Sequence, residues 1–285
     1  MSVLVIGAAD GLGHLVVRAL RERDVPVAVL AGDLAGSPAG PGVRVVPGDL
    51  ADPDSVRAGA RGCESVFLAS ACRIECHNTA ADAAADAGAR LVKLSPWPAA
   101  VREDSPAPGA RHHWISDRHL ARRGLPYTIL SPNYPMQELV RHYAPDVRRR
   151  GVLVDPAGGR GVGLVDESDV AEMAARVLTE PGHEGRTYAP TGPAAPSFGE
   201  LAALLAELTG APVAAEEPTG PELARWLARE HRPWEAELGA LFGQFRAGAG
   251  QSVTDDVRRV TGHEPRPVAD FLKANLHHFL PDSGG

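Results

Sequence analysis

Three glycines near the start of the chain have the spacing of a phosphate-binding turn. Gly7, Gly11 and Gly13 directly follow an apolar run over residues 3–6 and open an apolar helical pattern over 12–23. Glycines let the backbone turn tightly and approach phosphate oxygens, while the N–H groups at the start of a helix attract an anion. The order of strand, glycine turn and helix therefore predicts a site for the pyrophosphate of a dinucleotide, with a purely structural turn as the alternative.

His113 and Asp117 are four residues apart, so they share one face of the helix that we expect over residues 113–123. A carboxylate beside an imidazole can orient the ring and raise its pKa, which makes histidine a proton donor near neutral pH. Ser95 follows a predicted strand over 91–94, at the edge where open parallel sheets bind their ligands. The pattern predicts that Ser95 holds a substrate carbonyl while His113 donates a proton. A helix-surface pair and a strand-end serine without a role are the alternative.

Other candidate side chains lie at or just beyond the ends of predicted strands. Lys93 lies on the same side of its strand as the serine two residues later, so it is either a cofactor or substrate contact or a lysine that reaches solvent. Asn133, Tyr134 and Met136 follow a predicted strand over 127–130 and are expected to face the substrate, with Tyr134 as a second proton donor. Packing within the loop is the alternative for these three.

Cysteine and histidine residues follow the fourth predicted strand, at the strand ends where an open parallel sheet binds a dinucleotide. Cys72, Cys76 and His77 are close together there, but two cysteines and one histidine without a second cluster do not complete a zinc site. We therefore expect no metal. These residues should line the pocket or pack against a helix start, and we expect Cys72 to line the substrate pocket. Trp97 is expected to form part of the pocket wall or the core.

Six apolar runs in the first half of the chain suit buried strands, and helical patterns separate most of them. The runs cover residues 3–6, 27–30, 43–46, 65–69, 91–94 and 127–130, and the helical patterns cover 12–23, 53–60, 79–87 and 113–123. Strands that alternate with helices form a parallel sheet covered by helices on both faces. We therefore expect an α/β fold with a doubly wound parallel sheet.

The second half of the chain has shorter and less regular patterns. We expect strands over 152–154 and 163–165, and helices over 168–178, 197–208, 221–230, 255–260 and 268–279. Ser197 and Glu200 form a capping box, and the alternating Ala and Gly at 247–250 predict a flexible connector. These patterns divide the chain into a dinucleotide-binding domain over 1–150, to which part of the chain after 160 returns, and a smaller, mostly helical substrate-covering region over 151–285.

Composition restricts the classes of partner. The 285 residues carry a formal net charge of −7, whereas a nucleic-acid-binding protein needs a concentrated basic face. No apolar stretch reaches the length of a membrane span, and the chain begins as a strand rather than as a signal peptide. Three cysteines, an odd number, suggest a reducing compartment. We expect a cytoplasmic protein that acts on a small molecule, with no nucleic-acid or membrane partner.

Taken together, the motifs resemble those of the NmrA-like group of atypical short-chain dehydrogenases/reductases. They lie at 7–13, 48–50 (GDL), 92–95 (VKLS), 124–130 (GLPYTIL), 132–133 (PN), 136, 166, 169–171 (DVA), 185–188 (GRTY), 191–192 (TG), 198–202 (FGELA) and 261–262 (TG). The resemblance implies a Rossmann fold with a smaller C-terminal α/β part, and NAD(H) or NADP(H) as the cofactor. It also implies cofactor contacts from Asp10 and Leu12 in the turn, and from Asp49, Leu50 and Ala69 near strand ends.

Three positions depart from the pattern of that group. Asp10 stands where the group's turn has its middle glycine, and an aspartate beside a pyrophosphate must point away or cap the helix. The arginine that pairs with a 2′-phosphate in NADP-preferring relatives is absent after the second strand. Asp33 could there accept a hydrogen bond from a ribose hydroxyl and favour NAD, or be a loop residue without a role. Finally, His113-x-x-x-Asp117 takes the place of the Tyr-x-x-x-Lys acid/base pair.

Two functional hypotheses follow. The first is an NAD(P)-dependent oxidoreductase that acts on a small organic carbonyl, enone or quinone. The second is a non-redox Rossmann protein, either a dinucleotide-sensing regulator or an acid/base cyclase or dehydratase. We favour the first hypothesis; the three departures count toward the second, and the glycine turn is compatible with both.

Overall fold

The computed structural model describes residues 1–9, 11–32, 40–69, 74–230 and 235–280. Three of the predicted site residues, Asp10, Asp33 and Cys72, lie outside these described residues. None of the helices within the described ranges is long and apolar enough to cross a membrane.

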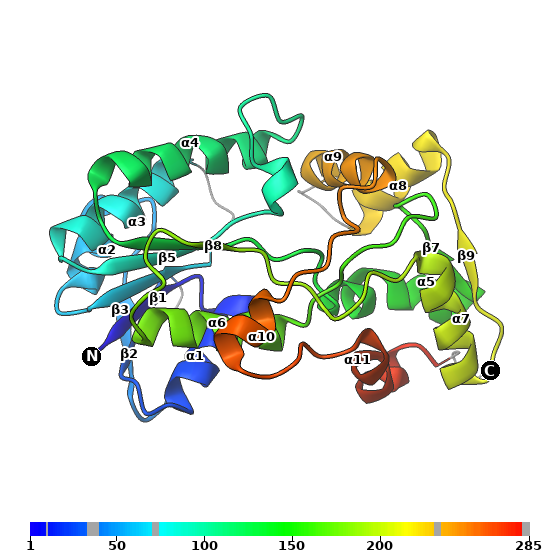
Figure 1. Ribbon diagram of the computed structural model, residues 1–285, viewed down its shortest axis with the longest axis horizontal. Coiled ribbons are helices and arrows are strands. Elements are labelled where there is room, and N and C mark those ends of the chain that lie inside the picture. Colours follow the sequence, from blue (N-terminus) through cyan, green and yellow to red (C-terminus); the bar gives the residue numbers. More distant parts are fainter. Residues whose placement is uncertain (10, 33–39, 70–73, 231–234, 281–285) are drawn as a thin grey trace.

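A seven-stranded parallel sheet forms one half of the molecule (Figure 1). Its strands, in chain order, are β1 Val3–Ile6, β2 Val27–Ala31, β3 Val43–Pro47, β4 Ser65–Leu68, β5 Arg90–Leu94, β6 Tyr127–Leu130 and β8 Thr187–Tyr188. Their spatial order is β3-β2-β1-β4-β5-β6-β8, so the direction of progress across the sheet reverses between β1 and β4. Open sheets of this kind bind ligands beyond the carboxyl ends of their strands, next to that reversal.

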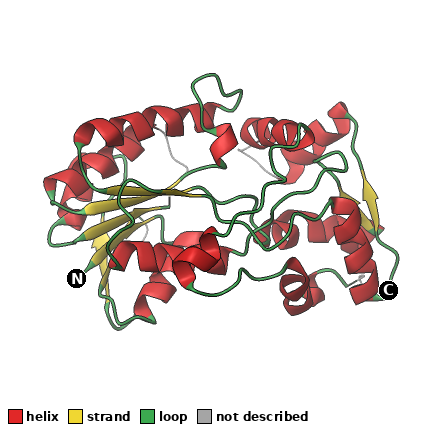
Figure 2. Ribbon diagram, in the orientation of Figure 1, coloured by secondary structure: helices red, strands yellow, loops and turns green. Residues whose placement is uncertain are grey.

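Helices cover both faces of the sheet, because side chains alternate between the faces along each strand (Figure 2). In β5, Val92 and Leu94 pack toward one face and Leu91 toward the other. The first face carries α1 Gly11–Arg21, α6 Glu167–Thr179 and α10 Asp256–Thr261; the second carries α2 Pro53–Ala60, α3 Ile74–Asp86 and α4 Pro108–Arg123. The expected doubly wound α/β fold is therefore confirmed.

A second hydrophobic core fills the other half of the molecule. It is rich in buried aromatic side chains, among them Tyr143, Phe198, Trp226, Phe242 and Phe245. A short parallel pair, β7 Val152–Val154 with β9 Ala214–Glu216, borders this core. The helical elements around it are η2 Leu139–Tyr143 (a π-helix), α5 Ala144–Arg150, α7 Phe198–Thr209, α8 Gly220–Glu230, α9 Glu235–Arg246 and α11 Val268–Ala274.

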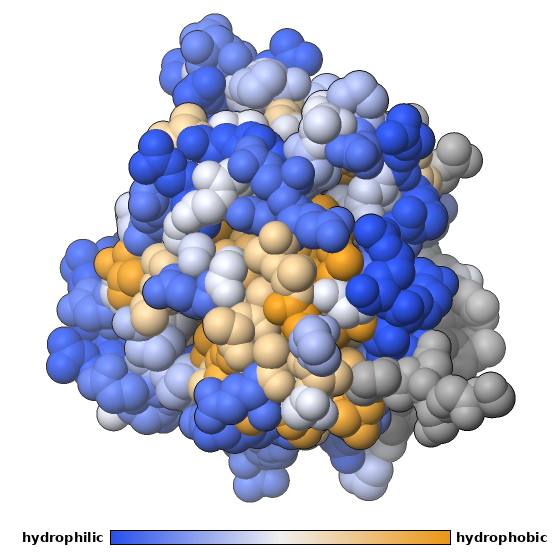
Figure 3. All heavy atoms as spheres, turned by 90° about the vertical axis from the view of Figure 1, so that its right-hand side faces the viewer, coloured by the Kyte–Doolittle hydropathy of each residue, from blue (hydrophilic) through white to orange (hydrophobic). Residues whose placement is uncertain are grey.

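Figure 3 views the molecule from this second end, where apolar side chains gather in the middle of the face and polar ones surround them. Several apolar residues packed against the second core, including Leu204, Leu208 and Val213, are only partly buried. Two short strands and the surrounding helices therefore cover this core incompletely.

The structure departs from the expected elements at several points. The predicted strand at 163–165 forms only an isolated bridge, because its backbone N–H groups bond to separate segments rather than to one neighbour. The helix expected from residue 113 begins at Pro108, since proline is well suited to a first helical turn. The helix expected over 268–279 ends at Ala274 and is followed by the 3₁₀ turn η3 Leu276–His278. The capping box of Ser197 and Glu200 forms as predicted.

Replacing Gly13 with alanine should strongly destabilise the fold. A Cβ atom at this position would lie 1.8 Å from the carbonyl oxygen of Gly7, and backbone cannot move aside as a flexible side chain can. We expect the free energy of unfolding to fall by about 3 kcal/mol or more, at the upper end of overpacking costs. The matched control is Gly243→Ala in α9, where a new Cβ meets nothing within 4 Å. Urea denaturation checks both variants, and equal stabilities would contradict the close approach.

Candidate active site

The glycine turn between β1 and α1 leaves no room for side chains at two positions. Gly7 has a φ of +84°, and a Cβ there would lie 2.9 Å from the carbonyl oxygen of Ala69. The helix passes so close behind it that a Cβ on Gly13 would overlap the Gly7 carbonyl. Gly11, with a φ of +53°, begins α1. The turn therefore exposes backbone at the start of a helix, which is the arrangement that holds a pyrophosphate.

A small pocket continues from this turn along the ends of β1, β2 and β3. It has a volume of about 190 Å³, and Asp49 and Leu50 line it together with Gly7. The carboxylate of Asp49 accepts the N–H of Ala51 at 2.8 Å, which shapes the chain after β3. Leu12, in contrast, packs against the core beneath the sheet. The pocket can take one of the two nucleoside halves of a dinucleotide whose pyrophosphate lies at the turn.

A larger pocket lies on the other side of the turn, beyond the ends of β4, β5 and β6. Its volume is about 370 Å³. We call it the acceptor pocket, and its lining residues are Ala69, Leu94, Ser95, Pro96, Trp97, His113, Pro132, Asn133, Tyr134, Pro135, Glu138, Leu238, Leu241 and Phe245. Ala69 contributes to this pocket and also packs against Gly7, so the glycine turn and the acceptor pocket share a wall.

Two buried polar atoms in the lining of the acceptor pocket have no hydrogen-bond partner in the described part of the chain. They are Oγ of Ser95 and Nδ1 of His113. Buried polar groups in native proteins are nearly always paired, so such atoms point to a ligand or to water. The structure thus brings Ser95 and His113 to one pocket, as the sequence pattern predicted.

The predicted partner of His113 is wrong. Asp117 accepts a hydrogen bond from the ammonium of Lys93, and no hydrogen bond joins it to the imidazole of His113. Lys93 is fully buried and also donates to the backbone carbonyl of His113 at 3.4 Å. It therefore ties β5 to α4 and neither reaches solvent nor lines the two pockets beside the turn.

The electrostatic consequence for His113 is the reverse of the expected one. Burial, and then the positive charge of Lys93, lower the pKa of His113 to about 2. Its ring also packs edge to face against His77, with centroids 4.6 Å apart. His113 is therefore a neutral imidazole throughout the physiological pH range, and it can donate or accept a hydrogen bond but does not carry a proton as imidazolium.

Two further predicted site residues do not serve as expected. The hydroxyl of Tyr134 lies 3.4 Å from that of Tyr143 in the aromatic core, and burial raises the pKa of Tyr134 well above its usual value. Tyr134 lines the acceptor pocket, but its hydroxyl contacts that of Tyr143 and its raised pKa makes it a weaker acid than expected. Met136 is buried beside Gly192 and lines a separate pocket with Leu164, so it does not contact the acceptor pocket.

Asn133 and Trp97 line the pocket and fasten a loop over it. The amide of Asn133 donates to the carbonyl of Gly250 at 2.9 Å, and the indole N–H of Trp97 donates to Ala249 at 2.9 Å. The Asn133 carbonyl accepts the N–H of Tyr134, so both ends of its side chain are used within the protein. The segment 247–250 is therefore held at the pocket by side chains rather than being a free connector.

Sequence reasoning missed the helix that closes the acceptor pocket. Leu238, Leu241 and Phe245 of α9 line it, and Phe242 of the same helix enters the second core. Their spacing of three and four residues is the signal of an amphipathic helix and was available in the sequence. Glu138, on the segment after β6, was also missed.

The geometry defines a class of protein: an open parallel sheet of Rossmann type with a dinucleotide-binding glycine turn. Residues 7–181 match the family described as NAD(P)H-binding. The chain belongs to this family, within the NmrA-like group of atypical short-chain dehydrogenases/reductases. NAD(H) or NADP(H) is accordingly its cofactor, and the tight turn at Gly7 and Gly13 fits that group.

Relatives extend over nearly the whole chain. The NAD(P)H azoreductase of Xenophilus azovorans is 32% identical over 292 residues, covering 97% of this chain and 99% of the azoreductase. The (4-alkanoyl-5-oxo-2,5-dihydrofuran-3-yl)methyl phosphate reductase of Streptomyces griseus is 34% identical, covering 98% and 100%. The triphenylmethane reductase of Citrobacter sp., solved in complex with NADP(H), superposes with a TM-score of 0.85 at 25% identity, covering 96% and 99%.

The buried neutral His113 should make the protein sensitive to acid. Below pH about 6.5 the unfolded chain binds a proton at this residue that the folded protein excludes, so stability falls as the pH falls. We expect the free energy of unfolding of the unmodified protein to drop more steeply than that of His113→Gln, by up to about 1.4 kcal/mol per pH unit. Urea denaturation between pH about 6 and about 4 measures both slopes. Parallel slopes would mean that His113 is protonated in the folded state.

Proposed function

We propose that this protein is an NAD(P)H-dependent reductase of small conjugated acceptors, with the acceptor oxygen held by Ser95 and His113. The observation that carries the proposal is the pair of buried polar atoms, Ser95 Oγ and His113 Nδ1, that line a pocket sharing a wall with the cofactor turn. The chain belongs to the NAD(P)H-binding family, and the reductases among its full-length relatives support an NAD(P)-dependent oxidoreductase that acts on small-molecule acceptors.

A nicotinamide cofactor held at the glycine turn would supply a hydride, and Ser95 and His113 would stabilise the negative charge left on the acceptor. The Ser95 hydroxyl can donate a hydrogen bond to that oxygen. A neutral imidazole whose proton is on Nδ1 donates a second one. Fixed donors that line a pocket stabilise a developing oxyanion without first having to reorient.

The acid strength of these groups restricts the acceptor. A neutral imidazole and a serine hydroxyl are weak acids, and the Tyr134 phenol is engaged with Tyr143. The pocket therefore suits acceptors whose reduced anion is delocalised, such as quinones and enones, because water can protonate that anion later. A simple ketone leaves a strongly basic alkoxide and needs a stronger acid beside it.

The walls of the acceptor pocket favour uncharged, flat molecules. Leu94, Trp97, Leu238, Leu241 and Phe245 provide apolar surface, and Lys and Arg are absent from the residues described as lining it.

Glu138 supplies a negative charge to the lining of the acceptor pocket. Burial acts to raise the pKa of Glu138, but hydrogen bonds from His142 and Arg141 outweigh it and lower that pKa, so the carboxylate stays ionised. Arg141 and His142 pair with this carboxylate at 2.9 and 3.2 Å and offset part of its charge. The residues described as lining the pocket include no lysine or arginine to bind an anion, so we expect uncharged acceptors to be preferred over the phosphate-bearing substrate named for the Streptomyces relative.

Removing the donors should reduce turnover while leaving cofactor affinity intact. We expect Ser95→Ala to lower kcat/KM for a quinone or enone by about a hundredfold, as for loss of one oxyanion donor, and His113→Gln to lower it to a similar extent. The matched control is Ser116→Ala, because Ser116 is a buried serine of α4 whose hydroxyl also lacks a partner in the described ranges but does not line the acceptor pocket.

The measurement is the acceptor-dependent oxidation of NADH and NADPH across a panel of quinones, enones and simple ketones, with calorimetry for cofactor affinity. Unchanged turnover in both variants would remove Ser95 and His113 from the mechanism. Cofactor binding without oxidation by any acceptor would instead support a dinucleotide sensor.

A further inference from the structure

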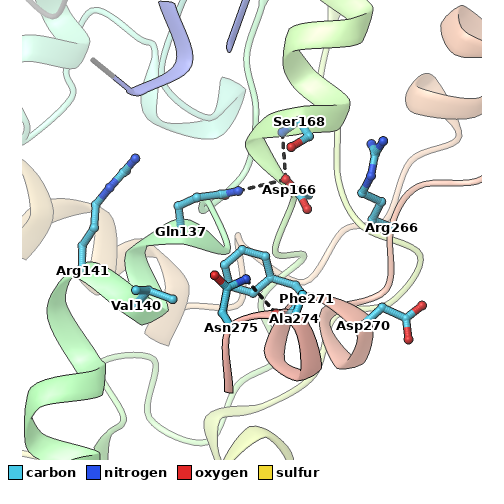
Figure 4. A pocket seen from close by; sticks show the side chains of 10 residues that line it. All are labelled: Gln137, Val140, Arg141, Asp166, Ser168, Arg266, Asp270, Phe271, Ala274 and Asn275. Atoms are coloured by element: carbon cyan, nitrogen blue, oxygen red, sulfur yellow. Dashed lines mark hydrogen bonds between the residues drawn. The ribbon is translucent and has the colours of Figure 1, made fainter. Parts of the chain in front are cut away.

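Arg141 places a guanidinium beside the glycine turn, although it comes from a distant part of the chain. It lies on the π-helix η2 after β6, and a Cβ atom on Gly11 would be 3.9 Å from its Nη2. Figure 4 shows its side chain extending away from Val140 and Asn275. Gly11 is the first residue of α1, so the positive charge of Arg141 lies next to the helix start that receives the pyrophosphate.

In this structure two carboxylates hold the guanidinium. Nη1 and Nη2 of Arg141 donate to the two oxygens of Glu167 at 2.9 and 3.0 Å, and Nη1 also donates to Glu138 at 2.9 Å. The Arg141 side chain remains 41% exposed, whereas that of Glu167 is only 9% exposed. The fork of two parallel N–H groups that grips a carboxylate has the geometry that also grips a phosphate.

A cation beside the glycine turn would add to the attraction that the helix start exerts on a pyrophosphate. The residues described as lining the two pockets beside the turn include neither lysine nor arginine. A dinucleotide carries two negative charges on its pyrophosphate, and helix N–H groups compensate them only in part. Arg141 lies close to Gly11, where the pyrophosphate is expected, although it belongs to an element outside the glycine turn.

We propose that Arg141 binds the pyrophosphate of the cofactor and exchanges the Glu167 carboxylate for phosphate when NAD(P)H enters. The inference rests on the cofactor binding of the proposed function and adds a specific residue to it. Glu167 then competes with the cofactor phosphate for the guanidinium. It holds Arg141 beside the turn in the free protein, and this competition weakens the net affinity for the cofactor.

The test measures the affinity of purified full-length variants for NADH and NADPH by calorimetry, without any acceptor. We expect Arg141→Gln to bind about ten- to a hundredfold more weakly, and Arg141→Lys to lie between, because lysine keeps the charge but loses the fork. Glu167→Gln should bind about two- to fivefold more tightly, because the competing charge is gone. Arg18→Gln, which removes an exposed arginine further along α1, should bind like the unmodified protein.

Inorganic pyrophosphate gives a second readout of the same site. It should displace NADH from the unmodified protein, and it should bind Arg141→Gln more weakly in proportion to the loss in cofactor affinity. Thermal melts verify that each variant is folded; if Arg141→Gln does not fold, Arg141→Lys and Glu167→Gln decide the question.

The outcomes distinguish failure of the proposed function from failure of the role proposed for Arg141. If the unmodified protein binds neither cofactor, the proposed function fails. If it binds and Arg141→Gln binds equally well, the role of Arg141 alone is overturned. If Glu167→Gln weakens binding as much as Arg141→Gln does, the ion pair merely shapes the turn, and the exchange of carboxylate for phosphate is wrong.

Discussion

The close approach of α1 to β1 at Gly13 and Gly7 is the constraint on which the rest of the site depends. The carbonyl of Gly7 occupies the space that a Cβ on residue 13 would need. The start of α1 therefore points directly at the edge of the sheet where the strand order reverses. Gly7 also packs against Ala69 at the end of β4. Because Ala69 lines the acceptor pocket, the same contact sets the position of that pocket relative to the cofactor turn.

An ion pair between a buried lysine and a partly buried aspartate sets the electrostatics behind the acceptor pocket. Lys93 on β5 and Asp117 on α4 pair with each other, and burial of such charges is costly unless both are well paired. The positive charge then adds to burial in keeping His113 neutral. The site is consequently one of hydrogen-bond donors rather than of strong acids. On the proposed function, this distinguishes it from an active site built on a tyrosine and a lysine, and we expect it to favour acceptors that tolerate slow protonation.

The sequence predicted the parts of the structure that depend on local pattern. Buried parallel strands form continuous apolar runs in the sequence, and the glycine turn was predicted because the backbone geometry at Gly7 and Gly13 requires glycine. Ser95 and Trp97 were placed correctly because they follow a strand end. The hydrogen-bond partner of Asp117 was not predictable from the sequence. The spacing of four residues placed Asp117 beside His113, whereas in the structure it pairs with Lys93 from another element. The direction of the Tyr134 phenol and the approach of Arg141 to Gly11 likewise depend on long-range packing.

The measurement that tests the account most directly is a single-turnover reaction of the enzyme–NAD(P)H complex with the best quinone or enone acceptor. The absorbance of reduced nicotinamide is followed for normal cofactor and for cofactor carrying deuterium at the transferred position. We expect that absorbance to decay on addition of acceptor, with a slower rate for the deuterated cofactor because the carbon–hydrogen bond breaks in the pocket. A cofactor that binds but stays reduced with every acceptor would contradict it and identify a protein that senses the dinucleotide.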